Sequence, residues 1–296
     1  MPLLFRKMLV ATDFSERAGL ATRRAAQLSA AHGASLELFA APPLPLPPMI
    51  WGDMAGLPLP DAADLLDAAQ SRLTAQAETL RQQFDVEISV HVRAGLAGRL
   101  VTARAEEIGA DLLVIGATGE GALAGRLLGS TAQDIVRGSR TPVLVVRTPA
   151  AQAYGRVLAA VDFTQDAARA VRIARALVPS AALSVFTALE LPRLPWTLFD
   201  GLDEEARKLR IASAHSGTVQ RLQRLVADLG VADAGIVVRE GRASHELVAA
   251  VEEGRADLLC LGAHGKGRFE AGLLGSVSLH AIAEAPCDVL VAPVKG

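Results

Sequence analysis

Short apolar runs alternate with longer segments in which apolar residues recur at helical spacing. The runs are rich in Leu, Val, Ile and Ala, which is typical of buried parallel strands. In the first half of the chain the predicted strands are 7–12, 36–40, 86–92, 111–116 and 142–146. The predicted helices between them are 15–32, 61–84, 97–108 and 130–137. Regular alternation of strand and helix predicts an α/β fold, with a doubly wound parallel sheet covered by helices on both faces.

The second half of the chain repeats this pattern of strands and helices. Met8-Leu-Val-Ala-Thr-Asp-Phe-Ser15 returns as Val157-Leu-Ala-Ala-Val-Asp-Phe-Thr164, and Leu127-Leu-Gly-Ser130 returns as Leu273-Leu-Gly-Ser276. Blocks that recur in the same order cannot come from shared composition, and their period is too long for a solenoid. We therefore expect two tandem Rossmann-like domains, 1–150 and 151–296, each with a five-stranded parallel sheet.

Composition narrows the classes of protein. The 296 residues are 51% hydrophobic and 21% charged, with a net charge of −2 and no basic block, so nucleic-acid binding is disfavoured. Two cysteines cannot build a disulfide framework. No apolar run approaches the ~20 residues of a membrane span, and the basic pair Arg6-Lys7 follows the first apolar residues rather than preceding them. These features predict a cytoplasmic protein without membrane insertion.

The candidate chemistry lies in a glycine loop that is also repeated. The spacing Gly116-x2-Gly119-x9-Gly129-Ser130 recurs as Gly262-x2-Gly265-x9-Gly275-Ser276, each time between an apolar strand and a helix start. Free backbone N–H groups in such a loop form an anion nest, and a helix N-terminus attracts phosphate. The alternative is that Gly-Ser only caps a helix; the identical context in both copies favours phosphate binding.

These loops, the aspartate after the first strand and the final Pro-Val-Leu-Val-Val strand resemble the universal stress protein family. The resemblance covers both halves and implies an adenine nucleotide α-hydrolase-like fold that binds ATP together with Mg²⁺ in stress responses. The nucleotide-binding residues that it implies are Asp13, Gly116, Gly119, Gly129, Ser130 and Thr131 in the first half. In the second half they are Asp162, Thr187, Gly262, His264, Gly265, Gly275, Ser276 and Val277.

Several of these residues have a second interpretation. Asp13 and Asp162 are predicted to meet ribose hydroxyls or Mg²⁺, but either could instead cap a helix or stabilise a turn. His264 has no orienting partner in the sequence, so we expect a loop contact rather than catalysis. Glu120 stands where the second copy has Lys266, which predicts tighter binding of phosphates in the second half.

The resemblance implies a nucleotide-dependent change of conformation or association, so we expect no catalytic residues and no enzyme, although slow ATP hydrolysis is compatible with such a site. A scaffold with vestigial nucleotide sites is the main alternative. An adenylating enzyme is a weaker one, because that class carries Ser-Gly-Gly-x-Asp-Ser where this chain has Thr12-Asp-Phe-Ser15.

The remaining expectations concern partners and thiols. The resemblance implies that the last strand of each half pairs the domains as an intramolecular pseudo-dimer, and a homodimer of the whole chain is compatible with this. The Pro-rich segment 42–60, with Trp51, is either a lid or partner-binding loop or an unstructured insertion. Cys260 is predicted to be buried and inert, and Cys287 to be partly exposed.

Overall fold

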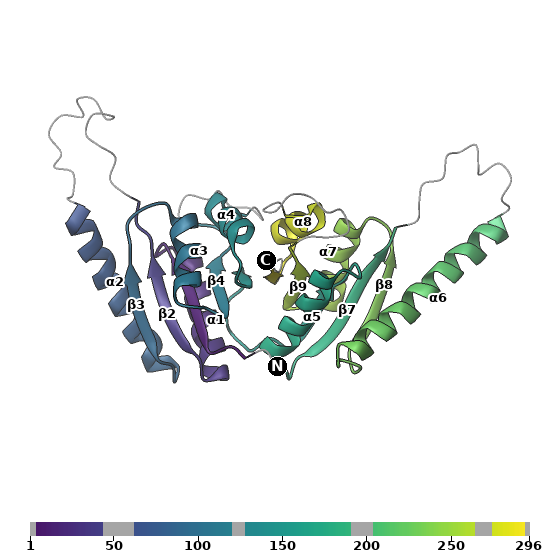
Figure 1. The fold of residues 1–296 in the computed structure, drawn as a ribbon, viewed down its shortest axis with the longest axis horizontal. Helices are drawn as coiled ribbons and strands as arrows, with labels where there is room; N and C mark the ends of the chain where they lie inside the picture. The colour runs from purple at the N-terminus through teal and green to yellow at the C-terminus, as the bar shows by residue number, and fades with distance from the viewer. Residues whose placement is uncertain (1–3, 44–61, 120–127, 191–203, 264–273, 294–296) are drawn as a thin grey trace, which may run out of the picture. The chain divides into compact units, whose positions relative to one another are not determined.

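The computed structural model describes residues 4–43, 62–119, 128–190, 204–263 and 274–293. The chain divides into two compact units, here called the N-terminal unit, Leu4–Ala153, and the C-terminal unit, which begins at Tyr154. Each unit carries its own alternation of strands and helices (Figure 1).

The N-terminal unit is a parallel sheet in the order β3-β2-β1-β4-β5. Its elements along the chain are β1 Lys7–Thr12, α1 Glu16–His32, β2 Ser35–Ala40, α2 Ala62–Gln83, β3 Ile88–Val92, α3 Ala97–Glu107, β4 Leu112–Gly116, α4 Ser130–Gly138 and β5 Val143–Val146. The strand order reverses between β1 and β4. Ligands of doubly wound sheets bind at this place, outside the carboxyl ends of the strands.

The C-terminal unit repeats this architecture, with its strands in the order β8-β7-β6-β9-β10. Its elements are β6 Arg156–Ala160, α5 Gln165–Leu177, β7 Ala182–Leu189, α6 Glu204–Asp228, β8 Gly235–Glu240, α7 Ala243–Gly254, β9 Leu258–Gly262, α8 Ser276–Glu284 and β10 Asp288–Ala292. The predicted fold class, two tandem domains with five-stranded parallel sheets, is confirmed.

Local signals explain where the helices begin and end. Ser15 caps α1 by accepting a hydrogen bond from the Ala18 N–H at 3.1 Å, and Thr164 caps α5 in the same way. Helix α1 ends at Gly33, whose φ of 60° is the left-handed conformation that glycine adopts without strain. Both ends of α1 follow from its sequence.

Helices cover both faces of each sheet and bury it. In the N-terminal unit α1 and α2 contact the same face and each other, since Gln76 of α2 donates to the Thr22 hydroxyl of α1. Helices α3 and α4 pack together on the opposite face, where Arg104 of α3 forms two hydrogen bonds with the Glu37 carboxylate of β2. Strands β4 and β5 are almost wholly buried and apolar, as strands covered on both faces should be.

Both cysteines are buried in the C-terminal unit. Cys260 of β9 is fully buried, as predicted. The expectation that Cys287 is partly exposed is wrong, because this residue, which directly precedes β10, is only 3% exposed. Burial raises the pKa of the Cys260 thiol well above its usual value and that of Cys287 to about 12. Neither thiol therefore forms a reactive thiolate at neutral pH.

Among the described residues, no helix has the length and apolar character needed to cross a membrane.

Candidate functional site

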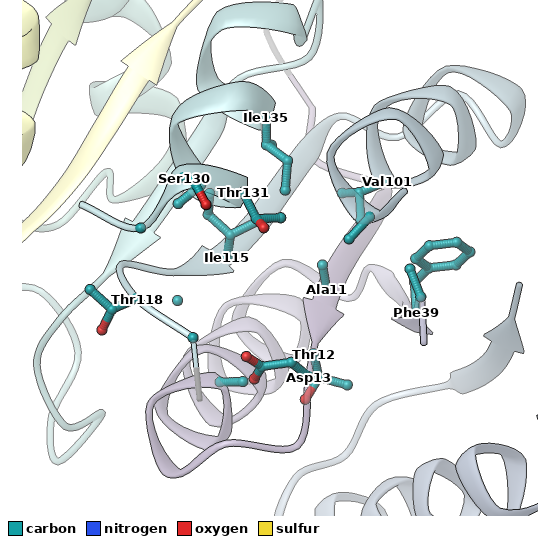
Figure 2. Close-up of a pocket in the computed structure, with 17 residues that line it drawn as sticks. Ala11, Thr12, Asp13, Phe39, Val101, Ile115, Thr118, Ser130, Thr131 and Ile135 are labelled. Carbon is teal, nitrogen blue, oxygen red and sulfur yellow. The ribbon is translucent and has the colours of Figure 1, made fainter. Parts of the chain in front are cut away.

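A pocket of about 560 Å³ lies at the switch point of the N-terminal sheet, between the ends of β1 and β4 and the start of α4 (Figure 2). It brings together every residue that the sequence predicted for this half. Asp13, Gly116, Gly119, Gly129, Ser130 and Thr131 all line it. The glycine loop and the first-strand aspartate, far apart in sequence, thus belong to one cavity.

The start of α4 supplies hydrogen-bond donors to this pocket. Gly129 is the N-cap residue and has no side chain to satisfy the free N–H groups of the first turn. Its own N–H donates to the Ala117 carbonyl at 2.9 Å, which closes the loop behind the helix start. Ser130 and Thr131 add exposed hydroxyls at the same place (Figure 2). The arrangement favours an anion at the helix N-terminus.

Two glycines of the loop are required for different reasons. A Cβ on Gly119 would lie 2.6 Å from Oδ2 of Asp13, so a side chain there would require the Asp13 carboxylate to shift. A Cβ on Gly116 would instead lie 3.3 Å from the backbone oxygen of Arg17. Gly119 therefore leaves room for the Asp13 carboxylate, whereas Gly116 allows α1 to approach β4.

Asp13 has both of the roles considered from the sequence. Its Oδ1 accepts a hydrogen bond from the Ser15 N–H at 3.0 Å, which stabilises the turn into α1. Its Oδ2 lies beside Gly119 and faces the pocket (Figure 2). Between the two turn residues, Phe14 has a φ of 65°, which is rare for a bulky residue, and the Arg72 guanidinium lies 4.3 Å from the centre of its ring.

The C-terminal unit has an equivalent pocket of about 590 Å³. Of the residues predicted for this half, Asp162, Thr187, Gly262 and Val277 line it. Gly275 and Ser276 form the start of α8, where Gly275 is the N-cap, but they are not among the residues that line the cavity. His264 and Gly265 lie outside the described residues, as do Glu120 and Lys266.

Asp162 presents a carboxylate oxygen without a partner. Its Oδ1 accepts hydrogen bonds from the N–H of Thr164 at 3.0 Å and from its hydroxyl at 2.5 Å. Its Oδ2 is buried and has no hydrogen-bond partner within the described parts of the chain. A buried carboxylate oxygen is costly to leave unsatisfied, so this atom is suited to accept from a ligand hydroxyl or to contact a cation.

Thr187 contributes differently from what was expected. Its hydroxyl donates to the Val161 carbonyl at 2.8 Å and is buried between β7 and the end of β6. The hydroxyl is thereby committed to the fold, so only the remaining surface of Thr187 meets the pocket. The sequence placed Thr187 at the end of the strand, but β7 continues to Leu189, and the sequence could not indicate that the Thr187 hydroxyl is bonded within the fold.

Sequence reasoning missed several pocket residues. Phe39 and Val101 form an apolar end, opposite the helix start, in the N-terminal pocket (Figure 2). Arg17 hydrogen-bonds to the hydroxyl of Thr118 on the pocket wall. In the C-terminal pocket Arg221 and Glu190 were missed. Phe39 directly precedes the predicted strand end and could have been found; the arginines and Glu190 have no motif.

Comparisons with known proteins agree with this architecture. A model of the universal stress protein family matches residues 4–147 and again residues 153–293. Universal stress protein Rv1996 of Mycobacterium tuberculosis is 31% identical over 196 residues, which cover 62% of this chain and 59% of that relative. The match therefore spans less than two thirds of that relative's length.

Two further matches extend over nearly the whole chain. Universal stress protein MT2698 of Mycobacterium tuberculosis is 28% identical over 308 residues, covering 96% of this chain and 95% of the relative. A solved universal stress protein from Archaeoglobus fulgidus superposes with a TM-score of 0.69 at 19% identity, covering 97% of this chain and 98% of that one. That superposition shows a shared fold. Together with the family match over both units, these findings show that the chain belongs to the universal stress protein family, as two tandem domains.

Proposed function

We propose that this stress protein binds an adenine nucleotide, ATP with Mg²⁺, in the pocket of each unit. The observation that carries the proposal is the repeated coincidence of three features at one switch point: a helix start capped only by glycine, a glycine-lined strand end and an aspartate. These are the donors, the space and the acceptor that a nucleotide needs at its phosphates and ribose.

The polarity of each pocket orients the ligand. Phosphates fit the starts of α4 and α8, where backbone N–H groups are free of helix partners. The apolar end, formed by Phe39 and Val101 in one unit and by Phe186 and Leu247 in the other, suits a base. Asp13 and Asp162, at the ends of β1 and β6, are then placed to accept from ribose hydroxyls or to contact Mg²⁺.

The residues present also fit a magnesium ion at the phosphates. Bound Mg²⁺ would neutralise phosphate charge, and it is usually held by one or two carboxylates together with the phosphates and water. Asp13 and Asp162 are the carboxylates in position, and the unpartnered Oδ2 of Asp162 gives the second pocket an oxygen ready for such a contact.

We propose that binding changes conformation or association rather than driving fast chemistry. The described lining of the N-terminal pocket offers hydroxyls and one carboxylate, Asp13, and its described side chains include no histidine, cysteine or lysine for general acid–base work. The proposal includes pairing of the two units with each other through their last strands, β5 and β10.

Titration calorimetry with ATP and Mg²⁺ tests the proposal. We expect wild-type protein to bind, and the double variant Asp13→Ala and Asp162→Ala to lose about tenfold or more in affinity, because each change removes a charged hydrogen-bond acceptor. Asp85→Ala, an exposed aspartate outside both pockets, is the matched control and should bind as wild type does.

Mass spectrometry of nucleotide retained after native purification gives an independent answer. If the purified protein retains no nucleotide and shows no heat of binding, the alternative of a scaffold with vestigial sites is favoured. Pyrophosphate release on addition of a carboxylic-acid substrate would favour the adenylating enzyme.

A further inference from the structure

The two pockets differ at the end that suits the base. Both units have a glycine just before the third helix, Gly95 and Gly241, and each donates its N–H to a carbonyl at the end of the second strand or just beyond it. The acceptors are Pro42 in the N-terminal unit, at 2.9 Å, and Leu189 in the C-terminal unit, at 3.2 Å. Leu189 therefore stands where Pro42 stands, and the next residue along is Pro43 in one unit and Glu190 in the other.

Glu190 is held at the pocket by the start of α7. Its Oε1 accepts a hydrogen bond from the Ala243 N–H at 2.7 Å, and both residues line the C-terminal pocket. The N-cap residue of α7, Arg242, makes no side-chain cap, so Glu190 supplies the cap from β7. Within the described chain Oε2 has no such partner. In the N-terminal unit Pro43 offers no acceptor at the corresponding place and does not line the pocket.

The repeat places Glu190 near the end that suits the base. Phe186 and Leu247 stand where Phe39 and Val101 form the apolar end of the N-terminal pocket. The exposed Glu190 is hydrogen-bonded to the start of α7, the helix that carries Leu247, whereas the phosphate end is assigned to Gly262 and the start of α8. A carboxylate repels phosphate, so its place at the opposite end agrees with the orientation proposed for the nucleotide.

An ionised carboxylate only accepts hydrogen bonds, which makes it selective among purines. Guanine presents two neighbouring donors, N1–H and the N2 amino group, which match a carboxylate edge. Adenine presents one amino group beside the N1 lone pair, which a carboxylate repels. We propose that Glu190 gives the C-terminal pocket a preference for guanine over adenine nucleotides that the N-terminal pocket lacks. The inference rests on the proposed function, because it takes the orientation proposed for ATP and adds GTP as a second ligand of the C-terminal pocket, which still binds ATP.

The test measures the ratio of GTP to ATP affinity in the C-terminal pocket of the full chain. We expect Gly119→Val to impair binding in the N-terminal pocket first, because a Cβ there would lie 2.6 Å from Oδ2 of Asp13 and would displace this carboxylate. In this background GTP and ATP, each with Mg²⁺, are titrated calorimetrically before and after Glu190→Gln. A glutamine keeps an oxygen that can cap α7 but replaces the second acceptor with a donor.

We expect Glu190→Gln to lower the GTP-to-ATP affinity ratio about tenfold, since a charged hydrogen bond to the base is lost for guanine only. Glu253→Gln is the matched control: this exposed glutamate lies near the other end of α7 and pairs with Arg239 outside the pocket. It should leave the ratio unchanged.

The outcomes separate this inference from the proposed function. If Glu190→Gln weakens GTP and ATP equally, or changes neither, Glu190 only caps α7 and the inference is overturned while nucleotide binding stands. If the parent protein binds neither nucleotide in either pocket, the proposed function fails and the inference fails with it.

Discussion

Glycine serves two purposes in the loop that lines each pocket. Gly119 leaves room for the Asp13 carboxylate, whereas Gly116 and Gly262 let a helix approach a strand end, with a Cβ on Gly262 only 3.2 Å from the Asp166 backbone. The spacing of the glycines predicted where the pocket would be. The spacing could not distinguish these two purposes, because each requires a residue without a side chain.

Buried polar atoms also escape prediction from the sequence. Tyr154 and Asp288 lie 134 residues apart in the sequence of the C-terminal unit. The tyrosine hydroxyl nevertheless lies 2.5 Å from Oδ2 of the fully buried aspartate. Nothing in either local pattern indicates this pair, because hydrogen bonding across so long a separation depends on the finished fold.

Removing this donor should destabilise the C-terminal unit. We expect Tyr154→Phe to lower the free energy of unfolding by about 1–3 kcal/mol, because a hydrogen bond to a buried carboxylate is lost while the ring volume is kept. Urea denaturation followed by circular dichroism measures this. An unchanged urea midpoint would mean that the hydrogen bond from Tyr154 to Asp288 contributes nothing to the free energy of unfolding.

At the scale of elements, hydrophobic pattern and capping residues locate the strands and helices well. Strand 7–12 is found as predicted, and the predicted helix 15–32 corresponds to α1 with Ser15 as its cap. The strand predicted over 86–92 is shorter, Ile88–Val92. The greater length of β7, which brings Glu190 to the pocket, depends on pairing with β8 and has no local signal.

Two glycines of α1 should respond to alanine in opposite directions. Gly19 lies inside the helix, and a Cβ there meets nothing within 4 Å, so Gly19→Ala should stabilise the protein by about 0.5–1 kcal/mol. Gly33 ends the helix at a φ of 60°, so Gly33→Ala should destabilise it by about 1 kcal/mol. Chemical denaturation of both variants checks this, and shifts of the same sign would contradict it.

At the scale of the whole molecule, duplication is the feature that the sequence reveals most clearly. The described residues of each unit line a pocket of that unit, so the chain has two candidate sites. The predicted ranking of their affinities stays a prediction, because Glu120 and Lys266, on which it depends, lie outside the described residues.

Blocking one pocket should therefore halve the binding stoichiometry. We expect two equivalents of ATP per wild-type chain and one for Gly119→Val, since the new side chain occupies space that Asp13 now fills in the N-terminal pocket alone. Calorimetry at saturating protein concentration measures the stoichiometry. Two equivalents bound to the variant would show that this glycine does not control access.

The two phenylalanines with left-handed backbone conformations affect how rigidly each pocket is formed before a ligand binds. Phe14 and Phe163 adopt left-handed backbone conformations, with φ of 65° and 66°. The Phe14 ring is covered by Arg72 of α2, and the Phe163 ring by Arg221 of α6. These turns fix the aspartates that precede them without help from a guest molecule. This wall of either pocket is therefore preorganised, so little conformational entropy of the protein should be lost there when a ligand binds.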